Sequence, residues 1–469
     1  MLKYRAKERR IFTSRKRMRR RSNRLWGFAS VLLFLLVLEL LTRLFVDISG
    51  KRGEFAQKDV SSEKIQAYQL NFVNPELEQN LDPKALKAKS SLAVGYELLS
   101  KQESQYWQIN EQGFRDRDPV PLVKPKDEIR IFLLGNSTAF GYGSTDNTAT
   151  ISEHLEKRLQ ERLQQQIASP NLYKPDVLPF DKVEKRKYQA KPSKIRQGKY
   201  RVINASVPGY ASGNELARLA LEVLKYKPDL VVALDGYEDL MLPSNKDAVQ
   251  ALQVNKTPDK PSSFVSYLSQ SIEPIENKSY LAKIAQKRWL NNRQKTIRSD
   301  FLLNEQTSDL VRHLPPNQEE LQLRIDRYLD HQKQILNLSA AAQIPLVVAM
   351  QPEITGRNPS QLTDTEGEIA TELGRTYIKQ MRNSYPVLIQ ATQQLARAFP
   401  QNMKVIDLYK LTEQYPSPSF LDPIHLNEAA NQKVAEQLYY AISSLPKMQL
   451  VPKQAPPPKS IYPKAYKRY

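Results

Sequence analysis

The hydrophobic residues of this chain fall into short apolar runs that alternate with longer amphipathic stretches. Runs rich in Val, Ile and Leu predict buried strands at 129–135, 200–206, 229–235, 345–351 and 404–408. Apolar residues at helical spacing predict helices at 151–163, 214–226, 319–342 and 427–442. Strands separated by helices pair in parallel through right-handed crossovers, with helices on both faces of the sheet. The pattern therefore predicts a three-layer α/β/α sandwich with a five-stranded parallel sheet.

The longest apolar segment, 25–46, lies near the start of the chain and reads LWGFASVLLFLLVLELLTRLFV. As a helix it can cross a hydrocarbon core about 30 Å thick. The preceding arm, 1–24, holds twelve Lys or Arg residues and one acid, Glu8. Because such arms stay on the cytoplasmic side, we expect a single-pass plasma-membrane anchor with the remainder of the chain outside the cytoplasm. A cleaved signal peptide is the alternative, but VDISGKRG follows, without a small-x-small cleavage site.

The charge and the cysteine content narrow the functional classes. A formal charge of +20 would ordinarily suggest a nucleic-acid partner. Much of it resides in the arm 1–24, where it acts as a topology signal, so we expect bilayer contact through 25–46 and no nucleic acid. Cysteine is absent, which excludes disulfides, thiolate metal sites and a cysteine nucleophile.

The rest of the chain divides by composition. Residues 47–125 are polar and mixed and are predicted to be a linker and lead-in, and 126–445 carries the alternating pattern. The tail 446–469 is rich in Pro and Lys and is predicted to be disordered. Three insertions interrupt the pattern and are expected to lie over the active face, near 168–199, 242–316 and 352–377.

The first predicted strand is followed by a candidate nucleophile. Active sites of open parallel sheets lie beyond the carboxyl ends of the strands. There the chain reads GNSTAFG, 135–141, with Ser137 in the strand-to-helix turn. A Ser in such a turn presents its hydroxyl at the sheet edge, and flanking glycines tolerate the tight backbone. On its own, however, the motif is more often a loop with a helix-capping Ser.

A candidate base lies in the loop after the last predicted strand, in Asp422-Pro-Ile-His425. An Asp three residues before a His can place its carboxylate against the ring. It then fixes the tautomer and supports the imidazolium that forms when His takes a serine proton. A simple helix-start loop is the alternative, since a helix is predicted from 427. The other three histidines are expected to have no role in the site: His154, His313 and His331.

Taken together, these motifs resemble the blocks of the SGNH (GDSL-like) hydrolase superfamily. GNSTAFG is similar to the family's GDSxxxG, and NASVPGYAS supplies the glycine of the second block, Gly209. DGYEDL, 235–240, stands in place of GxND, and DPIH matches DxxH. The lead-in INEQGFRDRD is also similar, so the resemblance extends from about 109 to 442. It implies a flavodoxin-like hydrolase fold.

The resemblance also implies roles for particular residues. Ser137 would be the nucleophile, with His425 as general base and Asp422 as its partner. The backbone N–H groups of Ser137 and Gly209 would form the oxyanion hole. Glu238 stands where the family has an Asn whose side chain donates to the oxyanion. No metal or cofactor is needed for this chemistry.

The sequence departs from the family pattern at two positions. Asn136 replaces the Asp of the first block, which keeps hydrogen-bonding capacity. Glu238 is the more serious change, because an ionised Glu can only accept a hydrogen bond. Three outcomes are open: Glu238 is protonated and donates, it turns away from the hole, or the site is weak or altered. A structural ion pair with an insertion is the alternative role.

These inferences predict a membrane-anchored, extracytoplasmic serine ester hydrolase that acts through an acyl-enzyme. Its expected substrates are O-acyl groups of envelope glycans or lipids. Two alternatives stay open, an O-acyltransferase on envelope polysaccharide and a non-catalytic SGNH-like module in envelope assembly.

Overall fold

The computed structural model describes residues 64, 66–73, 85–246, 307–410 and 418–456. The predicted arm 1–24, the apolar segment 25–46 and most of the insertion 242–316 lie outside these residues. Within the described ranges, no helix is both long enough and apolar enough to cross a membrane.

A five-stranded parallel sheet forms the centre of the described unit, in the order β11-β10-β9-β6-β8. All five strands predicted from the apolar runs are present: β6 (Glu128–Gly135), β8 (Lys199–Asn204), β9 (Leu230–Asp235), β10 (Leu346–Met350) and β11 (Met403–Asp407). The first strand of this sheet in the chain, β6, lies between β8 and β9. The chain therefore adds β8 on one side of β6 and then crosses over to add β9 on the other side. This reversal is the topological switch point at which open α/β sheets bind ligands.

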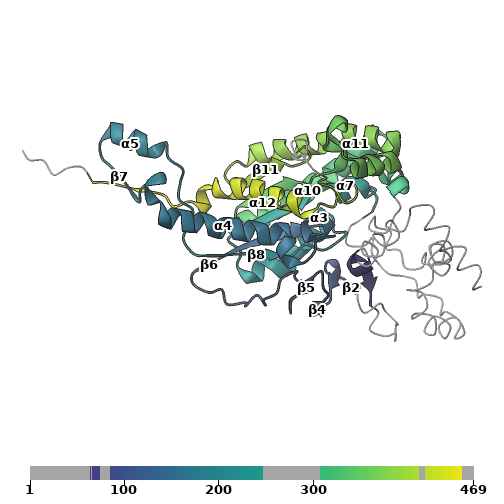
Figure 1. Cartoon of the computed structure of the whole chain (residues 1–469), viewed down its shortest axis with the longest axis horizontal. Coiled ribbons are helices and arrows are strands. Elements are labelled where there is room, and N and C mark those ends of the chain that lie inside the picture. The colour runs from purple at the N-terminus through teal and green to yellow at the C-terminus, as the bar shows by residue number, and fades with distance from the viewer. Residues whose placement is uncertain (1–63, 65, 74–84, 247–306, 411–417, 457–469) are drawn as a thin grey trace, which may run out of the picture. The chain divides into compact units, whose positions relative to one another are not determined.

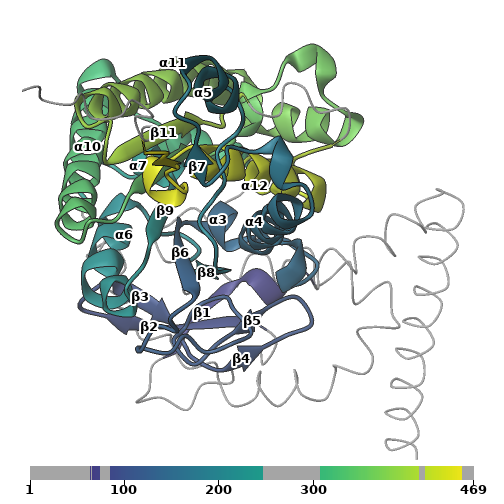
Figure 2. The same ribbon diagram turned by 90° about the vertical axis from the view of Figure 1, so that its left-hand side faces the viewer.

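Helices cover both faces of this sheet (Figures 1 and 2). On one face α4 packs beside α12, and on the other α10 packs beside α6 and α11. Their bounds are α4 Ile151–Ala168, α6 Ser212–Arg218, α10 Gln318–Ala341, α11 Asp364–Ala398 and α12 Glu428–Ser443. Helix α6 continues as a π turn, Leu219–Val223, and a 3₁₀ turn, Leu224–Tyr226. The arrangement is the predicted α/β/α sandwich.

The predicted insertion 352–377 is partly helical, because α11 already begins at Asp364. Thr363 and Glu366 form a capping box at its start. Glu366 is fully buried, faces Arg357 at 3.5 Å and accepts hydrogen bonds from the backbone of the 418–427 loop. A polar sequence can therefore begin a helix here, because its buried acid, Glu366, has partners that the periodicity does not reveal.

The described part of the lead-in is folded and packs against the hydrolase domain. Strands β1 (Leu70–Phe72), β2 (Leu86–Ser91) and β3 (Gly95–Leu98) form a three-stranded sheet, and β4 (Gln102–Glu103) pairs with β5 (Gln108–Ile109). Its aromatic residues form a second apolar core together with residues of the active-site loops, among them Phe140, Val207 and Tyr210. The lead-in therefore supports those loops directly.

The insertion 168–199 does not lie over the active face, contrary to the prediction. It connects the end of α4 to the start of β8, so it lies at the amino ends of the strands, opposite the site. It contains β7 (Val177–Leu178) and α5 (Lys182–Gln189). The prediction failed because the hydrophobic pattern shows where the insertion lies in the sequence, but it does not show at which edge of the sheet the insertion lies. Helix α4 runs back to the amino ends of the strands before the insertion begins.

The beginning of the predicted disordered tail is also ordered. Residues 446–456 contain the 3₁₀ turn η10 (Pro446–Met448) and the strand β12 (Lys453–Gln454), which pairs in parallel with β7. The N–H of Leu450 donates to the Lys194 carbonyl, and the N–H of Arg196 donates to the Met448 carbonyl. These two backbone hydrogen bonds hold the segment 448–450 against 194–196. Pro and Lys composition did not predict this order because the pairing partner is more than two hundred residues away. The remainder of the tail, 457–469, lies outside the described residues.

Candidate active site

The candidate site lies at the carboxyl ends of the central strands, at the switch point. Gly135 ends β6 with φ +149°, and Asn136 caps the short helix α3 (Ser137–Phe140), whose first residue is Ser137. The Gly209 loop follows β8, and α7 (Tyr237–Met241) follows β9. Each predicted block therefore reaches the same edge of the sheet, as its position after a strand implied.

Ser137, His425 and Asp422 form a continuous hydrogen-bonded chain. The Oγ of Ser137 lies 2.7 Å from Nε2 of His425. On the other side of the ring, Nδ1 bonds to the Asp422 carboxylate. An Nδ1–H held by a carboxylate leaves Nε2 free to accept the serine proton, which is the geometry a general base requires. The predicted residues are thus brought together in the predicted order.

Asp422 is held in its ionised form. Burial would raise its pKa, but the adjacent His425 ring and backbone N–H groups together lower the pKa below its ordinary value. Its Oδ1 accepts from the N–H of Ile424 at 3.0 Å and of His425 at 2.8 Å. The same tight turn therefore positions the ring and keeps the carboxylate charged beside it.

Two contacts that hold His425 were not predicted from the sequence. The ring of Tyr142 stacks on the imidazole with centroids 4.2 Å apart and planes 21° apart. The hydroxyl of Thr138 donates to the carbonyl of Ile424 at 3.1 Å. Both residues belong to the segment after the nucleophile, so α3 and the base loop are fixed to each other. A Tyr five residues after a Ser carries no signal for such a contact in the sequence.

The two predicted oxyanion donors are backbone N–H groups of Ser137 and Gly209. Gly209 has φ +83°, a conformation that favours glycine. Within the described part of the chain, neither N–H donates a hydrogen bond. The Gly209 loop is held from below: Tyr96 of β3 donates through its hydroxyl to the Pro208 carbonyl, and Tyr210 donates to the Tyr96 carbonyl. The lead-in sheet therefore positions one donor.

Glu238 faces Asn136, so the two departures from the family pattern form one contact. The Asn136 side-chain amide donates to the carboxyl of Glu238 and to the side-chain oxygen of Gln351. Its own oxygen accepts from the N–H of Thr138 at 2.9 Å. Gln351 was not predicted as a site residue, because the predicted strand 345–351 included it, whereas the observed strand β10 ends at Met350 and Gln351 follows it directly.

The carboxyl of Glu238 is buried, and burial raises its pKa well above the ordinary value. The amide of Asn136 offsets part of this shift, whereas the nearby carboxyls of Asp239 and Asp235 add to it. A neutral carboxyl keeps one O–H donor. The raised pKa favours the neutral carboxyl, and the contact with Asn136 shows that this carboxyl faces Asn136.

Further carboxyls lie behind Glu238. Asp235 accepts from the Tyr328 hydroxyl and the Gln332 amide, each at 2.7 Å, and Asp239 accepts from the backbone of Ser212 at 2.9 Å. The Ser212 hydroxyl also lies 2.8 Å from Nδ1 of a half-buried His331, so this histidine has a hydrogen-bonding partner beside the buried carboxyls. Among the described residues, no group of His, Asp and Glu side chains is arranged to hold a metal ion.

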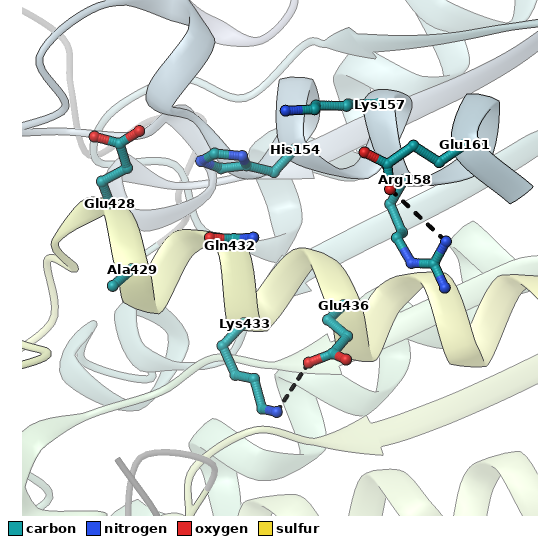
Figure 3. A pocket seen from close by; sticks show the side chains of 9 residues that line it. All are labelled: His154, Lys157, Arg158, Glu161, Glu428, Ala429, Gln432, Lys433 and Glu436. Atoms are coloured by element: carbon teal, nitrogen blue, oxygen red, sulfur yellow. Dashed lines mark hydrogen bonds and ion pairs between the residues drawn. The ribbon is translucent and has the colours of Figure 1, made fainter. Parts of the chain in front are cut away.

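A separate groove of about 600 Å³ lies between α4 and α12 (Figure 3). Positively and negatively charged side chains line it. Two ion pairs form within single helices: Arg158 with Glu161 at 3.8 Å in α4, and Lys433 with Glu436 at 2.8 Å in α12. None of the three residues of the Ser–His–Asp chain lines it. It is therefore distinct from the candidate active site.

A parallel α/β sheet with a Ser–His–Asp chain and free backbone donors at its carboxyl edge defines a serine hydrolase. The family model described as GDSL-like Lipase/Acylhydrolase matches residues 131–438. Since this match covers more than half of the chain, the chain belongs to that family and is a hydrolase of the GDSL (SGNH) type.

Solved structures that match this chain have low sequence identity to it. The acetyl xylan esterase AlAXEase is 13% identical, covering 67% of this chain and 100% of its own, with a TM-score of 0.31. The lipase/acylhydrolase from Enterococcus faecalis is 17% identical, covering 70% of this chain and 100% of its own, with a TM-score of 0.30. No curated protein matches the chain.

Proposed function

We propose that this hydrolase cleaves carboxylic esters through an acyl-enzyme on Ser137. The observation that carries the proposal is the 2.7 Å contact between the Ser137 hydroxyl and Nε2 of His425, with Asp422 on the opposite ring nitrogen. His425 takes the serine proton as Oγ attacks the ester carbonyl, and the tetrahedral oxyanion is stabilised by the N–H groups of Ser137 and Gly209.

The remaining steps use the same residues. The tetrahedral intermediate collapses, His425 gives its proton to the departing alkoxide, and an alcohol leaves. Water then loses a proton to His425, attacks the acyl carbonyl and releases a carboxylic acid together with free Ser137. The ionised Asp422 supports the imidazolium in both halves of the reaction.

The proposal extends to where the enzyme acts. The basic arm 1–24 and the apolar segment 25–46 support a plasma-membrane anchor with the hydrolase domain outside the cytoplasm. Esters within reach of such an enzyme are O-acyl groups of envelope glycans and of lipids. This part of the proposal rests on the sequence alone.

A hydrolysis assay tests the proposal. The full chain in detergent should release p-nitrophenol from p-nitrophenyl acetate. Ser137→Ala should lower kcat/KM by at least ~10³-fold, because it removes the nucleophile. Ser339→Ala is a matched control, since this serine is also buried but lies in α10 and its hydroxyl has no described partner.

The outcomes separate the competing functions. Equal turnover by the wild-type chain and by Ser137→Ala would refute the ester hydrolase. Turnover that depends on Ser137 and becomes much faster with a sugar acceptor, giving an acylated sugar, would identify an O-acyltransferase. No turnover and no labelling of Ser137 by a fluorophosphonate would indicate a non-catalytic module.

A further inference from the structure

The segment at the amino ends of the strands forms a folded projection. We call residues 169–194 together with 449–456 the β7–α5 projection. Asp181 caps α5 by accepting from the N–H groups of Val183 and Glu184, both at 2.9 Å, and β7 pairs with β12. Figure 1 shows α5 and β7 at one end of the described unit, beyond the helices that cover the sheet. The projection is thus ordered, and it does not contribute to the active-site edge.

Large apolar side chains are exposed on this projection. Phe180 is 58% exposed and Val183 is 77% exposed. The others there are Leu172, Val177 and Val451. Single exposed apolar residues are ordinary on a protein surface, but Phe180 and Val183 lie together at the start of α5, and grouped exposed apolar side chains are a feature of contact surfaces.

The same surface is basic. On α5, Arg186 and Lys187 lie three and four residues after Val183, so they flank it on one helical face. Both are exposed, as is Lys182 beside Val183, and none of the three forms an ion pair with a described residue. Residues 169–194 hold seven Lys or Arg and three acids, of which Asp176 pairs with Lys194 at 2.8 Å and Asp181 caps the helix.

We propose that the β7–α5 projection docks on an anionic lipid surface. Apolar side chains flanked by flexible cations are what an interfacial helix uses: Phe180 and Val183 enter the acyl boundary, while Lys182, Arg186 and Lys187 reach the phosphate layer. Each such cation contributes about a fivefold preference for the anionic surface. The opposite edge of the sheet, which carries Ser137, is left free. The inference does not depend on the proposed reaction.

The absence of cysteine from the chain makes a site-specific test clean. Val183→Cys in the full chain is labelled with the environment-sensitive fluorophore NBD and reconstituted into vesicles of phosphatidylcholine with or without phosphatidylglycerol. We expect blue-shifted emission and quenching by nitroxide-labelled lipids in phosphatidylglycerol vesicles at low salt. Raising the salt should reverse both, because screening weakens the attraction.

Two variants complete the experiment. Leu92→Cys is the matched control, because Leu92 is exposed in the turn between β2 and β3, away from the projection, and should stay unquenched. Arg186→Gln/Lys187→Gln in the labelled chain should shift the docking equilibrium about 25-fold toward the free form. An unshifted Val183 label in every vesicle overturns the proposal. Quenching of the Val183 label that is independent of lipid charge also overturns the proposal. A blue shift in detergent that grows with protein concentration overturns it as well, because it would show that a second copy of the chain covers this surface.

Discussion

At the scale of single residues, Asn136 and Glu238 together preserve the polar balance beside the nucleophile. Where the family has an acid in the first block and an amide in the third, this chain has an amide and an acid. The Asn136 amide donates to the Glu238 carboxyl. An Asp at 136 would instead place a second buried acid against Glu238, without the amide donor. The two departures are therefore one exchange, and neither implies a damaged site by itself.

This exchange predicts an unusual alkaline limit of activity. When the pH is below the raised pKa of Glu238, its carboxyl is neutral and does not repel the oxyanion. When the pH is above this pKa, the carboxylate carries a negative charge beside the oxyanion hole, so activity falls. Glu238→Gln cannot ionise, so it should retain activity at alkaline pH where the wild-type chain declines. The measurement is kcat/KM for p-nitrophenyl acetate from about pH 6 to about pH 10.

The matched control for this profile is Glu368→Gln, the same substitution at an exposed position of α11. It should reproduce the wild-type profile. Superimposable alkaline limbs for wild type and Glu238→Gln would show that Glu238 does not titrate near the reacting atoms.

At the scale of elements, the turn from β6 into α3 determines where the nucleophile lies. A Cβ added to Gly135 would be 2.4 Å from the Leu234 carbonyl oxygen and 2.5 Å from Cβ of Ala139. The strand β9 and the helix α3 can approach the β6 backbone this closely because residue 135 has no side chain. The glycine therefore fixes the turn by the space it leaves as well as by its φ of +149°.

Gly135→Ala should lower the free energy of unfolding by about 2–5 kcal/mol, combining backbone strain and overpacking. The control is Gly367→Ala in α11, where an added Cβ meets nothing within 4 Å. That change should raise stability by about 0.5–1 kcal/mol, as expected for Ala in place of a helical Gly. Urea unfolding measures both. Equal midpoints for the two variants would contradict the tight approach at 135.

At the scale of the whole molecule, buried carboxyls make stability depend on pH. Burial raises the pKa of Glu353 to about 7, and it also raises the pKa values of Asp235 and Glu215. In the unfolded chain these groups titrate near pH 4. Between these pH values the folded state binds more protons than the unfolded state, so stability falls as pH rises.

We therefore expect the free energy of unfolding to drop by a few kcal/mol between about pH 5 and about pH 8. Urea midpoints at the two pH values measure the change. In Glu353→Gln one contributor is removed, so the slope should be shallower whatever the absolute stability of the variant. A midpoint that rises with pH would show that these carboxyls are ionised in the folded protein.

The sequence by itself determined the strands, most of the helices and the positions of Ser137, Asp422 and His425. These features are local: a run of Val, Ile and Leu records burial, and a residue directly after a strand must lie at the carboxyl edge of a parallel sheet. The Asp422-to-His425 contact spans only three residues, so its geometry was already contained in the spacing.

Only the tertiary structure decided what surrounds these residues. Tyr142 on the His425 ring, Tyr96 beneath the Gly209 loop and the Asn136–Glu238 contact join residues far apart in the chain. The topology also decided that 169–198 lies at the amino ends of the strands. Local patterns record whether a residue is buried but not against what, and the protonation of Glu238 depends on those distant neighbours.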